Sequence, residues 1–304
     1  MHDVADQQLP PAGKLCLDHV AHFVPEVDAA SDALTRLGFT LTPFSPQSHR
    51  LQPDSPLVPA GTGNRCVMLS AGYLEFLTPL ADTPIAGQLR TAMGRYVGVH
   101  LIAFGTSQAQ SDHARLTQAG FSPLDAVALQ RQIETLQGMD TARFTVVRVL
   151  PGTMAEGRIQ YCQHLTPRLV WQSRWLEHPN GATGLTGVLL CVADPREAAQ
   201  RYARFTGLTP QPNGNAWRID TVRGYLAFID SALCRSTFGV EPPSLPWIAG
   251  YTLECSDLSR ARDVLQRNGI APNALPDKRL FVELPPALGS LLLFEPAQSA
   301  PISF

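Results

Sequence analysis

One pattern of residues occurs four times along this chain of 304 residues and restricts how it can fold. Each copy begins with a short apolar strand, continues through a turn into an amphipathic helix, and closes on a glycine that suits a left-handed helix cap. Self-similarity of this kind is typical of repeat architectures. The copies span residues 17–39, 97–121, 185–208 and 248–270, and their closing glycines are Gly38, Gly120, Gly207 and Gly269.

The segments that follow each closing glycine have the composition of strands. After the first copy come FTLTPF, NRCVMLSA and GYLEFLTP, and two or three comparable segments follow each of the other copies. Runs of β-branched and aromatic residues bounded by turn residues are typical of strands. Each unit is therefore one strand, one helix and about three further strands. The sequence predicts an α+β fold built from four βαβββ modules.

Composition excludes several classes of function. The net charge is −2 and charged residues are spread thinly, so no basic surface is expected for nucleic acid or anionic lipid. The six cysteines form no C-x-x-C pair and indicate free thiols in a reducing cytoplasm. Neither a signal-peptide pattern nor an apolar run long enough to span a membrane is present, so we expect a cytoplasmic protein. The sequence also lacks G-x-S-x-G, Walker A and H-E-x-x-H motifs.

The order strand, helix, LGF and three strands, with His on the first strand and Glu on the last, resembles the vicinal oxygen chelate superfamily, which includes glyoxalases and extradiol dioxygenases. Residues 48–77 are similar to its glyoxalase-like-domain members. The resemblance extends over about residues 15–297. It implies that the modules pair into two curved mixed sheets, each around an open cleft. We expect an N-terminal tail (1–14), a domain with a metal site (15–176) and a second domain without one (177–304).

Four side chains fall at positions that the resemblance implies are metal ligands. His19 lies 19 residues before the closing glycine of its copy and His100 lies 20 residues before its own, so one extra loop residue would bring the two into register. On the last strands, Glu75 in YLEFL matches Gln160 in RIQYC. Two imidazoles and a carboxylate suit Fe(II), Mn(II), Ni(II), Co(II) or Zn(II), and Gln160 could add an amide oxygen.

The C-terminal modules do not offer the same donors. Val188, Ala227 and Leu293 stand where the first two modules have their candidate ligands. We therefore expect this half to serve as a scaffold or as a wall of the cleft, without a metal.

Other polar residues near these strands are candidates for substrate contact. His49 precedes the GTGNR segment, Asn64 lies within it, and Arg148 on TVVRVL could face inward as an anion anchor. His164 either lines the cleft as an acid or base, alongside Glu75, or simply ends its strand. Glu75 itself could instead be a half-buried carboxylate paired with Arg65.

A divalent ion in this donor set would leave a net positive site, which favours a small anionic, chelating substrate such as an enediolate or a catecholate. Four protein ligands leave two open positions, which fits enediolate chelation better than simultaneous binding of a catechol and O₂. The sequence therefore slightly favours a lyase or isomerase over a ring-cleaving dioxygenase. The alternative is a metal-free protein that binds or sequesters a small molecule in a degenerate site. A homodimer is left open.

Overall fold

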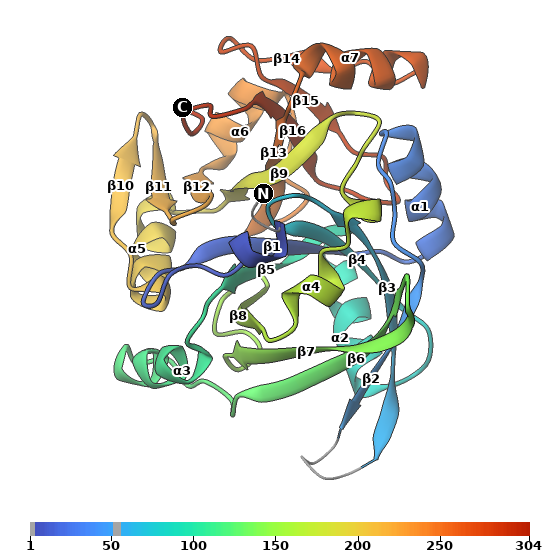
Figure 1. Cartoon of the computed structure of the whole chain (residues 1–304). Coiled ribbons are helices and arrows are strands. Elements are labelled where there is room, and N and C mark those ends of the chain that lie inside the picture. Colours follow the sequence, from blue (N-terminus) through green and yellow to red (C-terminus); the bar gives the residue numbers. More distant parts are fainter. Residues whose placement is uncertain (1–3, 51–55) are drawn as a thin grey trace.

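The order of strands and helices repeats four times in the computed structural model, which describes residues 4–50 and 56–304, without the side chains of residues 49 and 50. Each copy has one strand, one helix and three further strands, which confirms the mixed α+β class (Figure 1). The copies are β1 (Cys16–Phe23), α1 (Val27–Arg36), β2 (Ser45–Arg50), β3 (Leu57–Met68), β4 (Tyr73–Pro79); β5 (Gly98–Gly105), α3 (Ala109–Gln118), β6 (Val127–Thr135), β7 (Gly138–Arg148), β8 (Arg158–His164); β9 (Ala182–Cys191), α5 (Pro195–Thr206), β10 (Pro210–Asn213), β11 (Ala216–Asp220), β12 (Tyr225–Ile229); and β13 (Trp247–Cys255), α7 (Leu258–Arg267), β14 (Asn273–Ala274), β15 (Leu280–Glu283), β16 (Leu291–Pro296).

Shorter elements lie in the connections between these copies. Helix α2 (Pro84–Met93) follows β4, and α6 (Ser231–Phe238) follows β12. The remaining short helices are η1 (Val4–Gln7), α4 (Pro167–Val170) and η2 (Ser173–Trp175). None of the described helices is long and apolar enough to cross a membrane.

The ends of helix α5 show the local chemistry that begins and ends a helix. In α5, the Asp194 side chain accepts hydrogen bonds from the backbone N–H groups of Arg196 and Glu197, and Pro195 occupies the first turn. The helix ends at Gly207, whose φ of 73° lies in the left-handed region that favours glycine. The closing glycines of the other three copies also have positive φ angles, namely Gly38, Gly120 and Gly269.

The two expected sheets are joined into one. The strand path runs β10-β11-β12-β9-β13-β5-β1-β4-β3-β2, with β8, β7 and β6 extending from β5 and with β16, β15 and β14 extending from β13. Among the named strands, the two halves are joined by the single residue pair Ile248–Val99, and an isolated bridge between Ala71 and Gly184 adds a second backbone contact. Figure 1 shows the blue-to-green N-terminal half mostly below the yellow-to-red C-terminal half. Each half contains its own pair of modules. The pairing of β13 with β5 joins the two halves into one continuous order of strands.

Buried apolar side chains form one shared core and one smaller cluster in each half. The shared core lies on the helix side and includes Leu34, Leu116, Tyr202 and Leu265, one from each of the four module helices. The shared core therefore contains residues from both sides of the domain boundary expected between residues 176 and 177. The division into two domains at this point stays a prediction. The smaller clusters lie on the opposite face of the strands in each half.

The end of the chain packs into the cluster of the C-terminal half. Ile302 is buried in the same cluster as Ala227 and Leu293, two of the positions that lack ligands. Its backbone is held by hydrogen bonds from Asn213 Nδ2 to the Ile302 carbonyl (2.7 Å) and from the Ile302 N–H to the Tyr225 hydroxyl (3.4 Å). The chain's own residues therefore cover these positions.

Candidate functional site

A cavity of about 810 Å³ lies in the N-terminal half, against strands β1, β4, β5, β7 and β8 and helix α2. Its lining combines charged and amide side chains with a broad apolar wall. All four predicted metal ligands and one predicted substrate residue border it: His19, Glu75, His100, Gln160 and Arg148.

The strand register places Glu75 and Gln160 at equivalent positions. Glu75 on β4 pairs with Ala21 on β1, and Gln160 on β8 pairs with Ala103 on β5. Strands β1 and β5 are antiparallel neighbours at the centre. Each of these two side chains therefore has a small alanine as its neighbour on the central strands.

The two histidines are not equivalent in the same way, which corrects the expected register. The β1–β5 pairing shifts at two points, so that Asp18 on β1 and His100 on β5 are both extra residues without a cross-strand partner. Such β-bulges re-aim side chains. If Ala21 matches Ala103, Leu101 takes the place of His19, and His100 matches Asp18. His100 reaches the cavity wall because of its bulge rather than through symmetry with His19.

His19 is held in one orientation by a buried carboxylate. Its Nδ1 lies 2.6 Å from Oδ2 of Asp18, and its ring stacks on Tyr73 with the centroids 4.4 Å apart. Burial alone would raise the pKa of Asp18, but the imidazoles of His164 and His19 hold this pKa below its usual range. The ionised carboxylate can only accept, so Nδ1 of His19 donates, and in the neutral ring Nε2 then keeps its lone pair. Sequence analysis missed Asp18, although it directly precedes His19.

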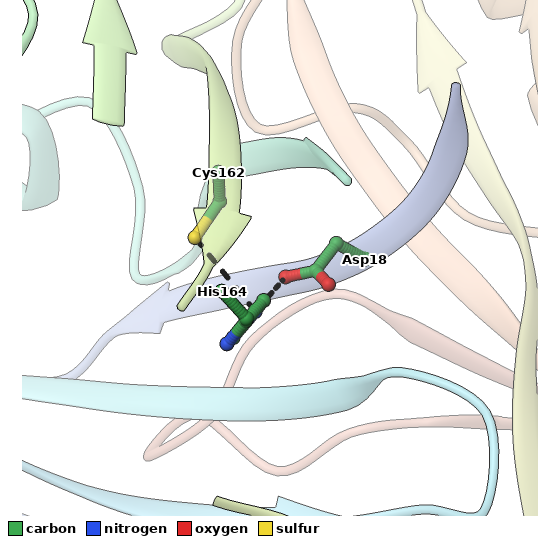
Figure 2. A group of neighbouring side chains, drawn as sticks. All are labelled: Asp18, Cys162 and His164. Atoms are coloured by element: carbon green, nitrogen blue, oxygen red, sulfur yellow. Dashed lines mark hydrogen bonds and ion pairs between the residues drawn. The ribbon is translucent and has the colours of Figure 1, made fainter. Parts of the chain in front are cut away.

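His164 lies behind the cavity wall rather than on it. Its Nε2 donates to the same Asp18 oxygen at 3.1 Å and lies 3.7 Å from Sγ of Cys162 (Figure 2). The imidazole is fully buried and does not border the cavity. A direct acid or base role is therefore not supported by its placement. Its contacts support Asp18, and through Asp18 they support His19.

His100 is oriented by the backbone near the start of its strand. Nε2 donates to the carbonyl of Tyr96 at 2.7 Å, and the ring stacks on Tyr96 with the centroids 4.1 Å apart. Because Nε2 carries the proton, Nδ1 is left with a lone pair, and this atom is buried without a hydrogen-bond partner. Burial lowers the pKa of His100 to about 4, so the ring is neutral near pH 7.

Glu75 is positioned by amides, not by Arg65. Oε1 accepts from Nδ2 of Asn64 at 2.5 Å and from Nε2 of Gln47 at 3.5 Å. Arg65 instead donates to the carbonyl of Thr42. No hydrogen bond within the described residues engages the other carboxylate oxygen of Glu75.

The other two predicted substrate contacts are placed less directly. Asn64 is buried, and it borders a neighbouring cavity of about 310 Å³ rather than the main one. It therefore acts on the main cavity by holding Glu75. His49 lies in β2 opposite Val58, and its side chain falls outside the described part of the structure.

Four arginines border the cavity, namely Arg95, Arg131, Arg148 and Arg158, and sequence analysis predicted only Arg148. Arg148 donates from Nε to Oε1 of Gln160 at 3.0 Å, and Arg158 donates to Oε1 of Gln88 at 2.9 Å. Arg131 lies over the ring of Phe144, 5.7 Å from its centroid. Burial, followed by the charge of Arg148, lowers the pKa of Arg158 to about 10. Strand alternation could have indicated Arg158, because it lies two residues before Gln160 and so faces the same side.

The donor set fits a divalent ion in its chemistry. Nε2 of His19 and Nδ1 of His100 both keep lone pairs, and a buried polar atom such as Nδ1 of His100 requires a partner. Glu75 adds a carboxylate with one oxygen open. The donor atoms of His19, Glu75 and His100, however, do not all lie within 4.8 Å of one another. Among the described residues, the three donors that all lie within 4.8 Å of one another are those of Asp18, Cys162 and His164 (Figure 2). An ion at the predicted set therefore requires side chains to move toward it.

Comparison with known proteins supports this fold. A family model described as a glyoxalase-like domain matches residues 17–206. A hypothetical protein from Staphylococcus aureus has a TM-score of 0.63 at 11% identity and covers 93% of this chain and 99% of its own.

Two further solved structures give a similar match. A mutant 4-hydroxymandelate synthase from Streptomyces coelicolor has a TM-score of 0.56 at 15% identity, with 94% of each chain covered. A fusion of a xylose isomerase-like TIM barrel with a 4-hydroxyphenylpyruvate dioxygenase has a TM-score of 0.56 at 11% identity and covers 97% of this chain and 51% of its own. No curated protein matches the sequence. At these identities the likeness shows the fold alone.

Proposed function

The chain belongs to the glyoxalase-like domain family, and on that premise we propose that it is an enzyme that acts on a small oxygenated anion in this cavity with the help of a divalent metal ion. The observation that carries the proposal is the Asp18–His19 pair beside the open carboxylate of Glu75. A carboxylate that holds one imidazole nitrogen fixes the tautomer and leaves the other nitrogen free, as in metal-binding histidines.

The residues of the chain have separable roles in this proposal. His19 and Glu75 would hold the ion, and His100 and Gln160 are the further donors on the same wall. When bound, a divalent ion lowers the pKa of a chelated oxygen and polarises a neighbouring carbonyl group. Asp18 keeps the proton of His19 on Nδ1. Asn64 and Gln47 orient Glu75 through Oε1, and its open oxygen can serve as a ligand to the ion or, when it is not a ligand, can accept a proton from a carbon next to the chelated group.

Proton transfer of the lyase or isomerase kind fits this wall better than ring cleavage with O₂. Glu75 is a positioned base, and Gln160 on the same cavity wall would take one more coordination position. The Arg148–Gln160 contact also holds a cation at this wall, where it could stabilise negative charge that develops on the substrate. The metal identity is open among Fe, Mn, Ni, Co and Zn.

One observation favours a second function, that of a metal-free binding protein. The donor atoms of His19, Glu75 and His100 do not meet the 4.8 Å spacing within the described residues, and His19 and Glu75 already have protein partners. A cavity of this size and lining could hold a small molecule without chemistry.

Thermal unfolding with added metal separates the two functions. After treatment with a chelator, the protein should gain roughly 4 °C in melting temperature at a metal concentration about 100 times Kd. The His19→Ala variant should lose this gain, because the oriented imidazole is removed. His113→Ala, a change on α3 away from the cavity, serves as the matched control and should keep it. If none of Mn, Fe(II), Co, Ni and Zn shifts the parent protein, the binding function replaces the enzyme.

A further inference from the structure

We propose that the ligand of this cavity is an amphipathic organic acid, with its acidic head held by Arg148 and Arg158 and its apolar body lying against the apolar side chains that surround them. The inference rests on the proposed function in one respect, since it takes the same cavity as the substrate site. It goes further in naming the class of substrate and the residues that select it.

The side chains that line the cavity carry an excess of positive charge. Arg131, Arg148 and Arg158 all border it, and none of them forms an ion pair with a carboxylate in the described part of the chain. Glu75 is the carboxylate on the wall, so positive charge is in excess. Buried charges are stable when they are paired, and an unpaired cation in a low-dielectric site attracts an anion.

Several N–H groups of these three arginines have no acceptor among the described residues. Arg148 uses Nε on the amide oxygen of Gln160, and its remaining N–H groups have no acceptor among the described residues. One nitrogen of Arg158 donates a hydrogen bond to the amide oxygen of Gln88, which is also a neutral partner. The Nε atom of Arg131 is buried without a partner. Planar guanidinium groups with free N–H pairs are the groups that bind carboxylates in a bidentate manner.

Apolar side chains form the wall of the cavity around these cations. Arg158 lies over Phe23 and Arg131 lies over Phe144, with distances of 5.8 and 5.7 Å to the ring centroids. Aliphatic side chains continue this wall, among them Leu77, Ile85, Leu129, Val146 and Met154. A polar metabolite of three or four carbons would leave most of this surface unused, whereas pockets of this volume suit drug-sized ligands.

The rim of the cavity has the same character. Leu124 and Leu150 border the cavity and are 40% and 48% exposed. Large aliphatic side chains at an opening favour the entry of an apolar body. The cavity therefore combines a cationic centre with an apolar wall and rim, which is the complement of an acid with a hydrocarbon or aryl body.

Two fluorescent probes with similar aromatic bodies test the inference. 1-Anilinonaphthalene-8-sulfonate carries an acidic group, and N-phenyl-1-naphthylamine does not. We expect the anionic probe to bind the parent protein, with decanoate displacing it and decanol failing to do so. Arg148→Gln and Arg158→Gln should each weaken the anionic probe by roughly tenfold or more, because a charge-assisted contact is lost. The neutral probe should change much less.

Controls make each outcome decisive. Arg235→Gln alters an exposed arginine of the C-terminal half and should behave like the parent. The melting temperatures of the two cavity variants should not fall, since each removes a cation without a counterion; if one variant fails to fold, the other and the decanoate–decanol comparison still decide. Equal losses of both probes, or unchanged anionic-probe affinity, would overturn the inference. Titrations with chelator and with Zn²⁺ keep this result separate from the metal proposal, because a failure of metal binding leaves the selectivity for the acid intact.

Discussion

Acidification from about pH 7 to about pH 4 should lower the free energy of unfolding by several kcal/mol, with about 3 kcal/mol from His22 alone. His22 is fully buried between the carbonyl of Leu288 (2.8 Å from Nδ1) and the hydroxyl of Tyr251 (3.1 Å from Nε2). Burial lowers its pKa from 6.5 to about 4. Between about pH 6.5 and 4, His22 binds a proton in the unfolded chain but stays neutral in the folded chain. The contribution of His22 to the free energy of unfolding is therefore complete above about pH 6.5 and is lost as the pH falls.

Urea unfolding at a series of pH values, with chelator present, measures this loss. His22→Gln should flatten the dependence between about pH 6.5 and 4, because the titrating ring is gone. His113→Ala on α3 should leave the dependence unchanged. His100, whose pKa burial also lowers to about 4, should supply a comparable share of the remaining slope. A parent protein whose stability is flat across this window would contradict the buried, neutral state of both rings.

Replacing Asp18 by alanine should destabilise the folded protein by about 3–5 kcal/mol, because two buried N–H donors are left without their acceptor. Its Oδ2 atom accepts from both His19 and His164, which are themselves buried. Without the carboxylate, two imidazole N–H groups lose their acceptor in a site that water does not reach. Sequence analysis did not consider this residue.

Two further variants separate the role of Asp18 in folding from its role toward metal. Asp82→Ala removes a carboxylate whose side chain is 100% exposed and should leave the stability almost unchanged. Asp18→Asn keeps the shape and an acceptor oxygen, so it should fold, yet its metal affinity should fall about 10- to 100-fold. Denaturation midpoints and metal titrations measure these effects. An Asp18→Ala variant as stable as Asp82→Ala would show that the Asp18 contacts contribute nothing.

The module order could be predicted because its signals are local. Helical spacing of apolar residues and a closing glycine are properties of about twenty consecutive residues, and each of the four closing glycines has a positive φ. The matching of Glu75 with Gln160 also follows from counting within modules, and the strand register agrees with it.

The bulges could not be predicted in the same way. Whether Asp18 and His100 have cross-strand partners depends on how β1 pairs with β5, two strands about 80 residues apart in sequence. Counting back from a glycine assigned the extra residue to a loop, but the structure places it in the strand. His164 shares strand parity with Gln160, yet it lies at the end of β8 and contacts Asp18 behind the wall. Among the named strands, the joining of both halves into one sheet likewise depends on the single pair Ile248–Val99.

Crystals of the protein soaked with Zn²⁺, with anomalous scattering recorded at the zinc edge, show whether His19 and Glu75 hold a metal ion. We expect one peak on the cavity wall, about 2.0–2.2 Å from Nε2 of His19 and from a carboxylate oxygen of Glu75. The same crystals of His19→Ala should lose the peak. A peak instead between Asp18, Cys162 and His164, or none at full soaking concentration, would contradict the metal site proposed for this cavity.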